Sequence, residues 1–253
     1  ATSAGPSMWL NNGRGFFALS SSPWWSDAAG ITGASQVGTA RSMAVGDLDG
    51  DGDLDIVLNS GDFMLNNGQA SFTVDRFHAA AITVDAKVGN IVLVDVDGDK
   101  DLDIVTFIPV GLAGDLTLSL FLNSGSGTFT DATSANLPSI VGLSVEAGDL
   151  NGDGKIDLFV TGDLASPVLL NDGSGIFTAQ ACVASGQQCV TATSVQAKLG
   201  DMDGDGDLDI VIASRISGAM YRNTGAGFFE ATSAISPEIG TVGVCRKYPR
   251  PTK

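Results

Sequence analysis

The chain has 253 residues, of which 43% are hydrophobic and 33 are glycine, and its formal net charge is −16. This composition is globular, because it is too apolar for a disordered chain, and no apolar run approaches the roughly 20 residues that a helix needs to span a bilayer. The negative charge argues against nucleic acid as a partner, since a phosphate backbone binds a basic surface.

Two sequence marks recur along the chain. The first is a turn signature of asparagine, glycine and phenylalanine, in LNNGRGFF, LNNGQASF, LNSGSGTF, LNDGSGIF and RNTGAGFF. The second is an acidic cluster, which reads DLDGDGDLD from residue 47, DVDGDKDLD from 95, DLNGDGKID from 149 and DMDGDGDLD from 201. The clusters begin 48, 54 and 52 residues apart, and a period of this length indicates stacked supersecondary units.

Each unit reads as four short strands. In the first full unit, residues 42–48 lead into the acidic cluster and residues 55–60 leave it as a Val/Ile/Leu strand. Residues 63–68 form a strand that ends in an Asn-x-Gly turn, which is a hairpin signal, and residues 70–77 alternate out of it. Four strands in about 50 residues, without helical periodicity, predict an all-β fold: a β-propeller of four-stranded antiparallel blades.

The repeats predict a single β-propeller domain over residues 1–253. There are five hairpin turns but four acidic clusters, so we expect about five blades, either closed into a ring from both termini or forming part of a six- or seven-bladed ring. The expected segments are the end of a partial blade and a linker at 1–40, four repeats at 41–85, 86–140, 141–192 and 193–235, and the first strand of the closing blade at 236–253. The turn phenylalanines are expected in the core between blades: Phe17, Phe72, Phe129, Phe177 and Phe229.

Each acidic cluster has the spacing of a metal-binding loop. Counted from Asp47 as position 1, carboxylates fall at positions 1, 3, 5 and 9, with Gly52 at position 6. Oxygen ligands at alternate positions around a glycine bend are typical of hard-cation loops of the EF-hand type, in which position 7 ligates through its carbonyl. Four carboxylates favour Ca²⁺ over Mg²⁺, and the loops contain no histidine or cysteine that would favour zinc. The predicted site residues, for about four calcium ions at one per loop, are Asp47, Asp49, Asp51, Asp53, Asp55, Asp95, Asp97, Asp99, Asp101, Asp103, Asp149, Asn151, Asp153, Lys155, Asp157, Asp201, Asp203, Asp205, Asp207 and Asp209.

The four loops differ in ways that should change their affinity. The second loop has Lys100 where glycine is expected, which is strained if that residue is left-handed. The third has Asn151 at position 3 and Lys155 at position 7, so it should bind most weakly, and loops one and four should bind most tightly. The alternative is an acidic surface turn without metal, in which neighbouring carboxylates repel by about 1 kcal/mol per pair.

The combination of DLDGDGDLDIVL with FMLNNGQASF resembles the VCBS or FG-GAP repeat, the unit of integrin α-subunit-like β-propellers and of many secreted proteins. The resemblance implies one calcium ion in the loop between the first two strands of each blade. It also implies a secreted or cell-surface protein that acts in adhesion, in carbohydrate recognition or as a structural module. The "GAP" half of the integrin motif is missing, so the chain resembles the broader VCBS group more than the integrins.

Other residues suggest alternatives to a non-enzymatic adhesion, recognition or extracellular structural module. Trp24 and Trp25 stand in a Pro/Ser-rich segment, and sugars stack on such rings, so a carbohydrate-binding lectin is the main alternative. A polysaccharide lyase-type enzyme is a weaker one, because the single histidine, His78, has no catalytic setting. The expected partner is an extracellular protein, a glycan or a second copy of the chain. Cys182 and Cys189 are spaced so that they can close a small disulfide loop, although the sequence cannot prove this pairing.

Overall fold

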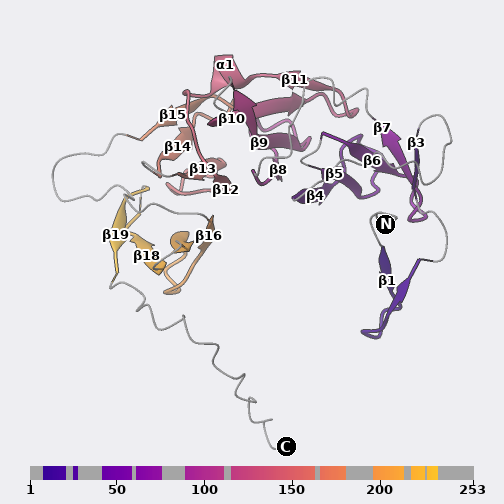
Figure 1. The fold of residues 1–253 in the computed structure, drawn as a ribbon. Helices are drawn as coiled ribbons and strands as arrows, with labels where there is room; N and C mark the ends of the chain where they lie inside the picture. Colours follow the sequence, from indigo (N-terminus) through magenta and orange to yellow (C-terminus); the bar gives the residue numbers. More distant parts are fainter. Residues whose placement is uncertain are drawn as a thin grey trace, which may run out of the picture.

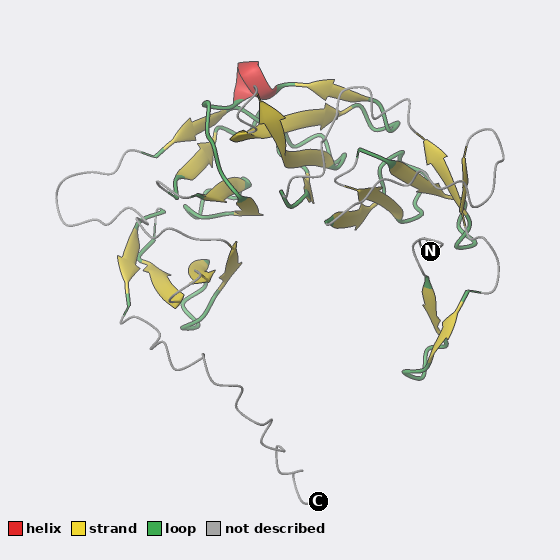
Figure 2. Ribbon diagram, viewed as in Figure 1, coloured by secondary structure: helices red, strands yellow, loops and turns green. Residues whose placement is uncertain are grey.

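The structure, a computed structural model, describes residues 8–20, 25–27, 42–58, 61–75, 89–110, 115–162, 166–180, 196–213, 218–225 and 227–232. Across these ranges the secondary structure is β-strand except for one four-residue helix, α1 (Thr133–Asn136) (Figure 2). The strands form separate sheets that follow one another along an open arc (Figure 1). The predicted all-β propeller architecture is therefore confirmed.

Four of the described sheets contain the predicted four-stranded antiparallel unit, and we number these blades 1 to 4 in chain order. Blade 1 contains β4 (Met43–Gly46), β5 (Asp55–Leu58), β6 (Phe63–Asn66) and β7 (Phe72–Asp75). Blade 2 contains β8 (Val92–Val94), β9 (Asp103–Val110), β10 (Asp115–Asn123) and β11 (Phe129–Asp131). Blade 3 contains β12 (Ser144–Gly148), β13 (Asp157–Thr161), β14 (Val168–Asn171) and β15 (Phe177–Ala179). Blade 4 contains β16 (Gln196–Gly200), β17 (Asp209–Ala213), β18 (Gly218–Asn223) and β19 (Phe229–Ala231).

Two further features stand outside this four-stranded unit. The first turn signature forms a separate two-stranded hairpin, β1 (Trp9–Asn11) and β2 (Phe17–Leu19). Blade 1 gains a fifth strand, β3 (Trp25–Asp27), which pairs parallel with β7 and places Trp25 opposite Phe72. The sequence placed β3 in a linker, and the structure shows that this part of the linker belongs to the edge of blade 1.

Each acidic cluster forms the loop between the first two strands of its blade. In blade 1 the last residue of β4, Gly46, pairs with Asp55, the first residue of β5. The same pairing joins Gly148 to Asp157 in blade 3. Position 9 of the loop is therefore fixed in the sheet, while positions 1 to 8 form the turn.

The core lies between neighbouring blades. Leu48, Val57 and Phe63 of blade 1 form one buried cluster with residues of blade 2, including Ile91 and Phe121. Similar clusters fill the junctions between blades 2 and 3 and between blades 3 and 4. Since a blade has apolar residues on both faces, it reaches full burial only when it has a neighbour on each side.

The phenylalanine prediction is confirmed in three blades and is wrong for the hairpin. Phe177 and Phe229 are buried in clusters that join two blades, and Phe129 is partly buried at the junction of blades 1 and 2, with its ring centroid 5.3 Å from that of Phe63. Phe72 is also buried, but in a cluster of blade 1 residues that Met8 contacts. Phe17, however, is 60% exposed. Its hairpin lies at one end of the arc, where no described blade covers this side (Figure 1).

Ring closure stays a prediction. The described structure contains four blades and one hairpin, which agrees with about five units, and the arc is open between β1–β2 and blade 4 (Figure 1). The segment expected to supply the closing strand, 236–253, lies outside the described residues. No helix of the described part is long and apolar enough to cross a membrane.

Candidate metal centre

The carboxylate at position 1 shapes each acidic loop. Oδ1 of Asp47 accepts a hydrogen bond from the Gly50 amide at 2.8 Å, and its Oδ2 accepts one from the Gly52 amide at 3.0 Å. Asp95, Asp149 and Asp201 accept the same two bonds in the other loops. The backbone therefore turns around the carboxylate, as a loop that encloses a cation requires.

Position 6 is left-handed in every loop, as the glycine pattern predicts. Gly52 has a φ of 90°, and the lysine that replaces glycine in the second loop, Lys100, has a φ of 79°. A left-handed lysine costs roughly 1–2 kcal/mol of backbone strain. Lys100 thus has the left-handed backbone on which the expected strain depends.

The position-9 aspartates connect the loop to the hairpin of the same blade. Asp55 is fully buried; its Oδ2 accepts from the Leu48 amide at 2.9 Å and its Oδ1 from the Asn66 amide at 2.8 Å. Asp103, Asp157 and Asp209 are equally buried and make the same pair of bonds. A carboxylate offers about four acceptor sites, so these residues keep capacity for a cation.

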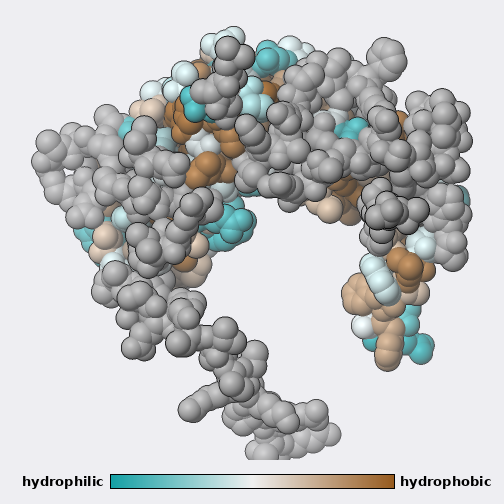
Figure 3. Space-filling model, in the orientation of Figure 1, coloured by the Kyte–Doolittle hydropathy of each residue, from teal (hydrophilic) through white to brown (hydrophobic). Residues whose placement is uncertain are grey.

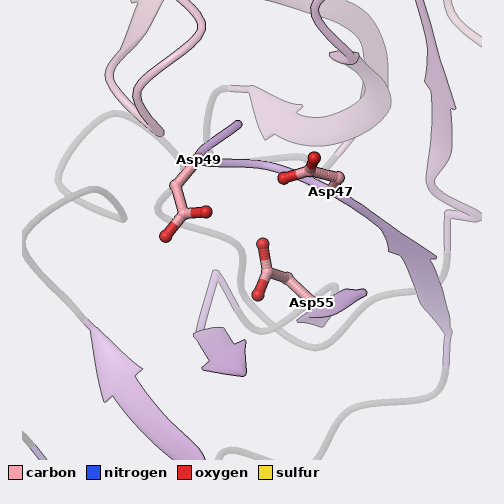
Figure 4. A group of neighbouring side chains, drawn as sticks. All are labelled: Asp47, Asp49 and Asp55. Carbon is pink, nitrogen blue, oxygen red and sulfur yellow. The ribbon is translucent and has the colours of Figure 1, made fainter. Parts of the chain in front are cut away.

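Three carboxylates converge in each of three loops. Oxygen atoms of Asp47, Asp49 and Asp55 lie within 4.8 Å of one another and point toward a common centre (Figure 4). The corresponding groups are Asp95, Asp97 and Asp99 in loop two and Asp201, Asp203 and Asp209 in loop four. Among the described residues, loop three forms no such group, and it has only three aspartates, at positions 1, 5 and 9.

The remaining predicted residues lie around these centres in two ways. At position 5, Asp51 and Asp205 fall outside the converging groups of loops one and four, and Oδ1 of each accepts from the amide of position 7. At position 7, the side chains of Asp53, Asp101 and Lys155 lie against the glycine of the hairpin turn of their own blade. This placement agrees with a position whose carbonyl, and not its side chain, would face an ion.

Burial and the charge of neighbouring carboxylates disfavour the ionised form of the position-9 aspartates. Burial raises the pKa of Asp103 to about 6 from an ordinary value of 3.8. Burial also raises the pKa of Asp55 and that of Asp157, and neighbouring carboxylates add to both shifts. No lysine or arginine of the described ranges forms an ion pair with these three residues. A hard divalent cation fits this oxygen-only set, since it would restore the ionised form.

In the described part of the chain, two basic side chains lie within 4.0 Å of a loop carboxylate. Nζ of Lys155 lies 3.5 Å from Oδ2 of Asp153, and the pKa of Asp153 is lowered, first by the Lys155 amide hydrogen bond. In loop four, Arg222 lies 3.9 Å from Asp203. Sequence reasoning included Lys155 but missed Arg222, because the arginine comes from β18 and only the fold brings it to the loop.

The turn asparagines connect neighbouring loops, a role that the sequence did not predict. Nδ2 of Asn171 donates to the Ile156 carbonyl of its own loop at 2.9 Å and to the Val96 carbonyl of blade 2 at 2.7 Å. Asn123 and Asn223 make the same bonds one blade earlier and one blade later. We call these three residues the latch asparagines, because each joins position 2 of the preceding loop to its own blade.

Among the described residues, the counterpart in blade 1 has no bond to a preceding blade. Nδ2 of Asn66 donates to the Leu54 carbonyl at 3.1 Å, and its buried Oδ1 has no hydrogen-bond partner in the described structure. Asn66 is therefore a natural comparison for the latch asparagines, with the same turn position and fewer bonds.

Several predicted residues cannot be placed in a site. Trp24, His78, Cys182 and Cys189 lie outside the described residues, and Trp25 is described only through the pairing of β3. The glycan-binding role of the two tryptophans and the disulfide therefore stay predictions.

Blades of this strand order, each with an acidic loop between its first two strands, define a β-propeller with candidate metal loops in its blades. Family models give the same result: an FG-GAP-like repeat matches residues 110–160 and 149–212, and an FG-GAP repeat matches residues 39–74. Together these matches cover more than half of the sequence. The chain belongs to the FG-GAP repeat family.

Solved structures similar to the chain include a lectin from Agrocybe aegerita, described as recognising non-reducing terminal N-acetylglucosamine. It is 23% identical, with a TM-score of 0.47, over 77% of this chain and 51% of the lectin. The Tc holotoxin pore of Photorhabdus luminescens is 18% identical, with a TM-score of 0.41, over 77% of this chain and 9% of the toxin chain. The chain thus spans about half the length of the lectin and less than a tenth of the toxin. No curated protein matches the chain.

Proposed function

We propose that the chain is a calcium-binding β-propeller that acts outside the cell as a non-enzymatic recognition module. The observation that carries the proposal is the convergence of three carboxylates within 4.8 Å in loops one, two and four. One of the three is a fully buried aspartate in loops one and four. Calcium accepts six to eight oxygen ligands in flexible geometry, which suits loops that differ in composition.

In this proposal each residue type has its own role. The carboxylates at positions 1, 3, 5 and 9 and the carbonyl at position 7 would contact the ion, and the position-9 aspartate would do so from the first residue of its strand. The bound ion would supply positive charge that offsets the repulsion among the carboxylates. Because ions that bind only the folded form stabilise it by mass action, calcium should raise the stability of the blades.

Calcium titration by calorimetry, together with thermal melts in calcium and in EDTA, tests the metal sites. The melting temperature should be higher in calcium. Asp49→Asn should weaken one binding event, because it removes one charge from the converging group of loop one and leaves the asparagine that loop three has at position 3. Asp115→Asn is the matched control, since Asp115 is exposed and pairs with Val110, at the opposite end of β9 from Asp103. An unchanged melting temperature in EDTA would refute calcium as part of the fold.

The recognition role is supported by membership of the FG-GAP repeat family. The resemblance to this family implies a secreted or cell-surface protein. The expected partner is an extracellular protein or a glycan, and Trp24 and Trp25 are the predicted glycan-binding residues. Binding to a glycan array in calcium should fall on Trp24→Ala or Trp25→Ala if the module is a lectin. Self-association or protein binding without any glycan hit would favour the adhesion or structural role instead.

A further inference from the structure

The three junctions between described blades share one design. Each blade presents a leading face, made by loop position 2, the third residue of the second strand and the residue three before the turn asparagine. In blade 1 these residues are Leu48, Val57 and Phe63, and all three are buried. In blade 3 the equivalents are Leu150, Phe159 and Val168, which are also buried. A leading face is thus an interface that the next blade covers.

The leading face of blade 4 is not covered in the described structure. Its position-2 residue, Met202, is 51% exposed, and the two equivalents, Val211 and Met220, are only half-buried. The glycine that ends the first strand of blade 4, Gly200, also has no residue of a following blade near it in the described structure. A Cβ at Gly46 would meet Leu102 of the next blade at 2.5 Å, whereas a Cβ at Gly200 would meet only Met202 of its own loop.

The β1–β2 hairpin carries the complementary surface. It corresponds to the third and fourth strands of a blade, with Trp9 at the place of Tyr221 and Phe17 at the place of Phe229. In blade 4 both equivalents are buried against blade 3. Trp9 and Phe17 are each 60% exposed. Leu10, Phe16 and Leu19 are also exposed, at 45%, 72% and 54%. In Figure 3 the hairpin projects from the arc, with brown hydrophobic residues beside teal ones. Exposed apolar patches of this kind mark interaction surfaces.

The hydrogen-bonding groups of the two surfaces also match. Oδ1 of Asn11 accepts from the Gly13 amide at 2.9 Å, as Oδ1 of each latch asparagine accepts from the glycine of its own turn. In the latch asparagines this bond accompanies an Nδ2 that donates to the position-2 carbonyl of the preceding loop. The Met202 carbonyl is the position-2 carbonyl of the last described loop, and no described asparagine donates to it.

We propose that the β1–β2 hairpin docks on the leading face of blade 4 in the same molecule. Trp9 and Phe17 would cover Met202, Val211 and Met220, and Asn11 would form a fourth latch with the Met202 carbonyl. The opposite side of the hairpin already contacts blade 1, where Met8 packs against a buried cluster. The hairpin and blade 4 lie at the two ends of the arc (Figure 1), and their covalent connection gives the hairpin a high effective concentration at that face.

Site-specific photo-crosslinking on the full chain tests this contact. The photoreactive amino acid p-benzoylphenylalanine is placed at position 9, and the cross-linked peptides are identified by mass spectrometry. The expected result is an adduct between position 9 and the segments that contain Met202 or Met220, in a product that migrates as a monomer. The same probe at position 17 gives a second reading in case the first variant does not fold.

Position 16 provides the matched control. Phe16 is 72% exposed, and its equivalents Thr128 and Ile176 are exposed in complete blades, so the probe there should give no adduct with blade 4. Adducts from position 9 only in a dimer would assign the face to a second copy and overturn the proposal. Absence of adducts with blade 4 from both positions 9 and 17, in folded variants, would overturn it as well.

Discussion

Replacing Asn171 with alanine should measure how strongly one latch holds two blades together. The side chain donates to the carbonyls of Val96 and Ile156 and accepts from the Gly173 amide, all within 2.9 Å. Three net hydrogen bonds are worth about 3 kcal/mol, and the Val96 carbonyl, in a residue that is 2% exposed, would lose a partner at a further cost of about 1–2 kcal/mol. We therefore expect Asn171→Ala to lower the free energy of unfolding by about 4–5 kcal/mol.

The matched control is Asn66→Ala, at the same turn position in blade 1. Asn66 donates one side-chain bond, to a carbonyl of the exposed residue Leu54, so its loss should cost about 1 kcal/mol or less. Urea unfolding of both variants, followed by circular dichroism in the same calcium concentration, gives the comparison. Equal losses for the two variants would refute the reasoning, because the bond to the preceding blade would then contribute nothing measurable.

Three further predictions concern single residues of the loops and junctions. Burial raises the pKa of Asp103 to about 6, so in EDTA its contribution to stability is present below about pH 4 and lost as the pH rises through 6, by up to about 3 kcal/mol. In calcium the unfolding free energy should instead rise with pH, because the ion binds the ionised carboxylate. Urea midpoints at several pH values, with calcium and with EDTA, check both pH dependences, and identical profiles would contradict the prediction. Lys100→Gly should raise the unfolding free energy by about 1 kcal/mol, because it relieves a left-handed lysine; a lower urea midpoint would show that the φ of 79° is not strained. Gly46→Ala should cost about 1–3 kcal/mol through overlap with Leu102, whereas Gly200→Ala should cost less than about 1 kcal/mol, and thermal melts that rank them in the opposite order would argue against the described junction.

Much of the fold could be predicted because the information is local and repeated. Each blade contains its own hairpin signal and its own acidic loop, so the strands on either side of Asp55 or Asp103 follow from about ten neighbouring residues. The left-handed backbone at Lys100 was predictable for the same reason, since the other loops have glycine at that position.

The contacts that the sequence did not reveal join distant residues. Asn123 and Leu48 are 75 positions apart, and so are Asn171 and Val96, so no local pattern distinguishes a latch from an ordinary turn asparagine. The approach of Arg222 to Asp203 depends likewise on how β18 lies beside loop four. The sequence predicted which aspartates belong to each loop, but it did not predict which three of them converge. In loop one the group takes position 9, and in loop two it takes position 5.

The shortness of the fourth strand in each blade has a consequence for behaviour at high protein concentration. Strands β11, β15 and β19 have three residues each and lie at the edges of their sheets. A chain that added itself to such an edge would gain few ladder hydrogen bonds, so these edges are poor templates for cross-β aggregation. In blade 1 the four-residue β7 is covered by β3, so the edge of this sheet is again a strand of three residues.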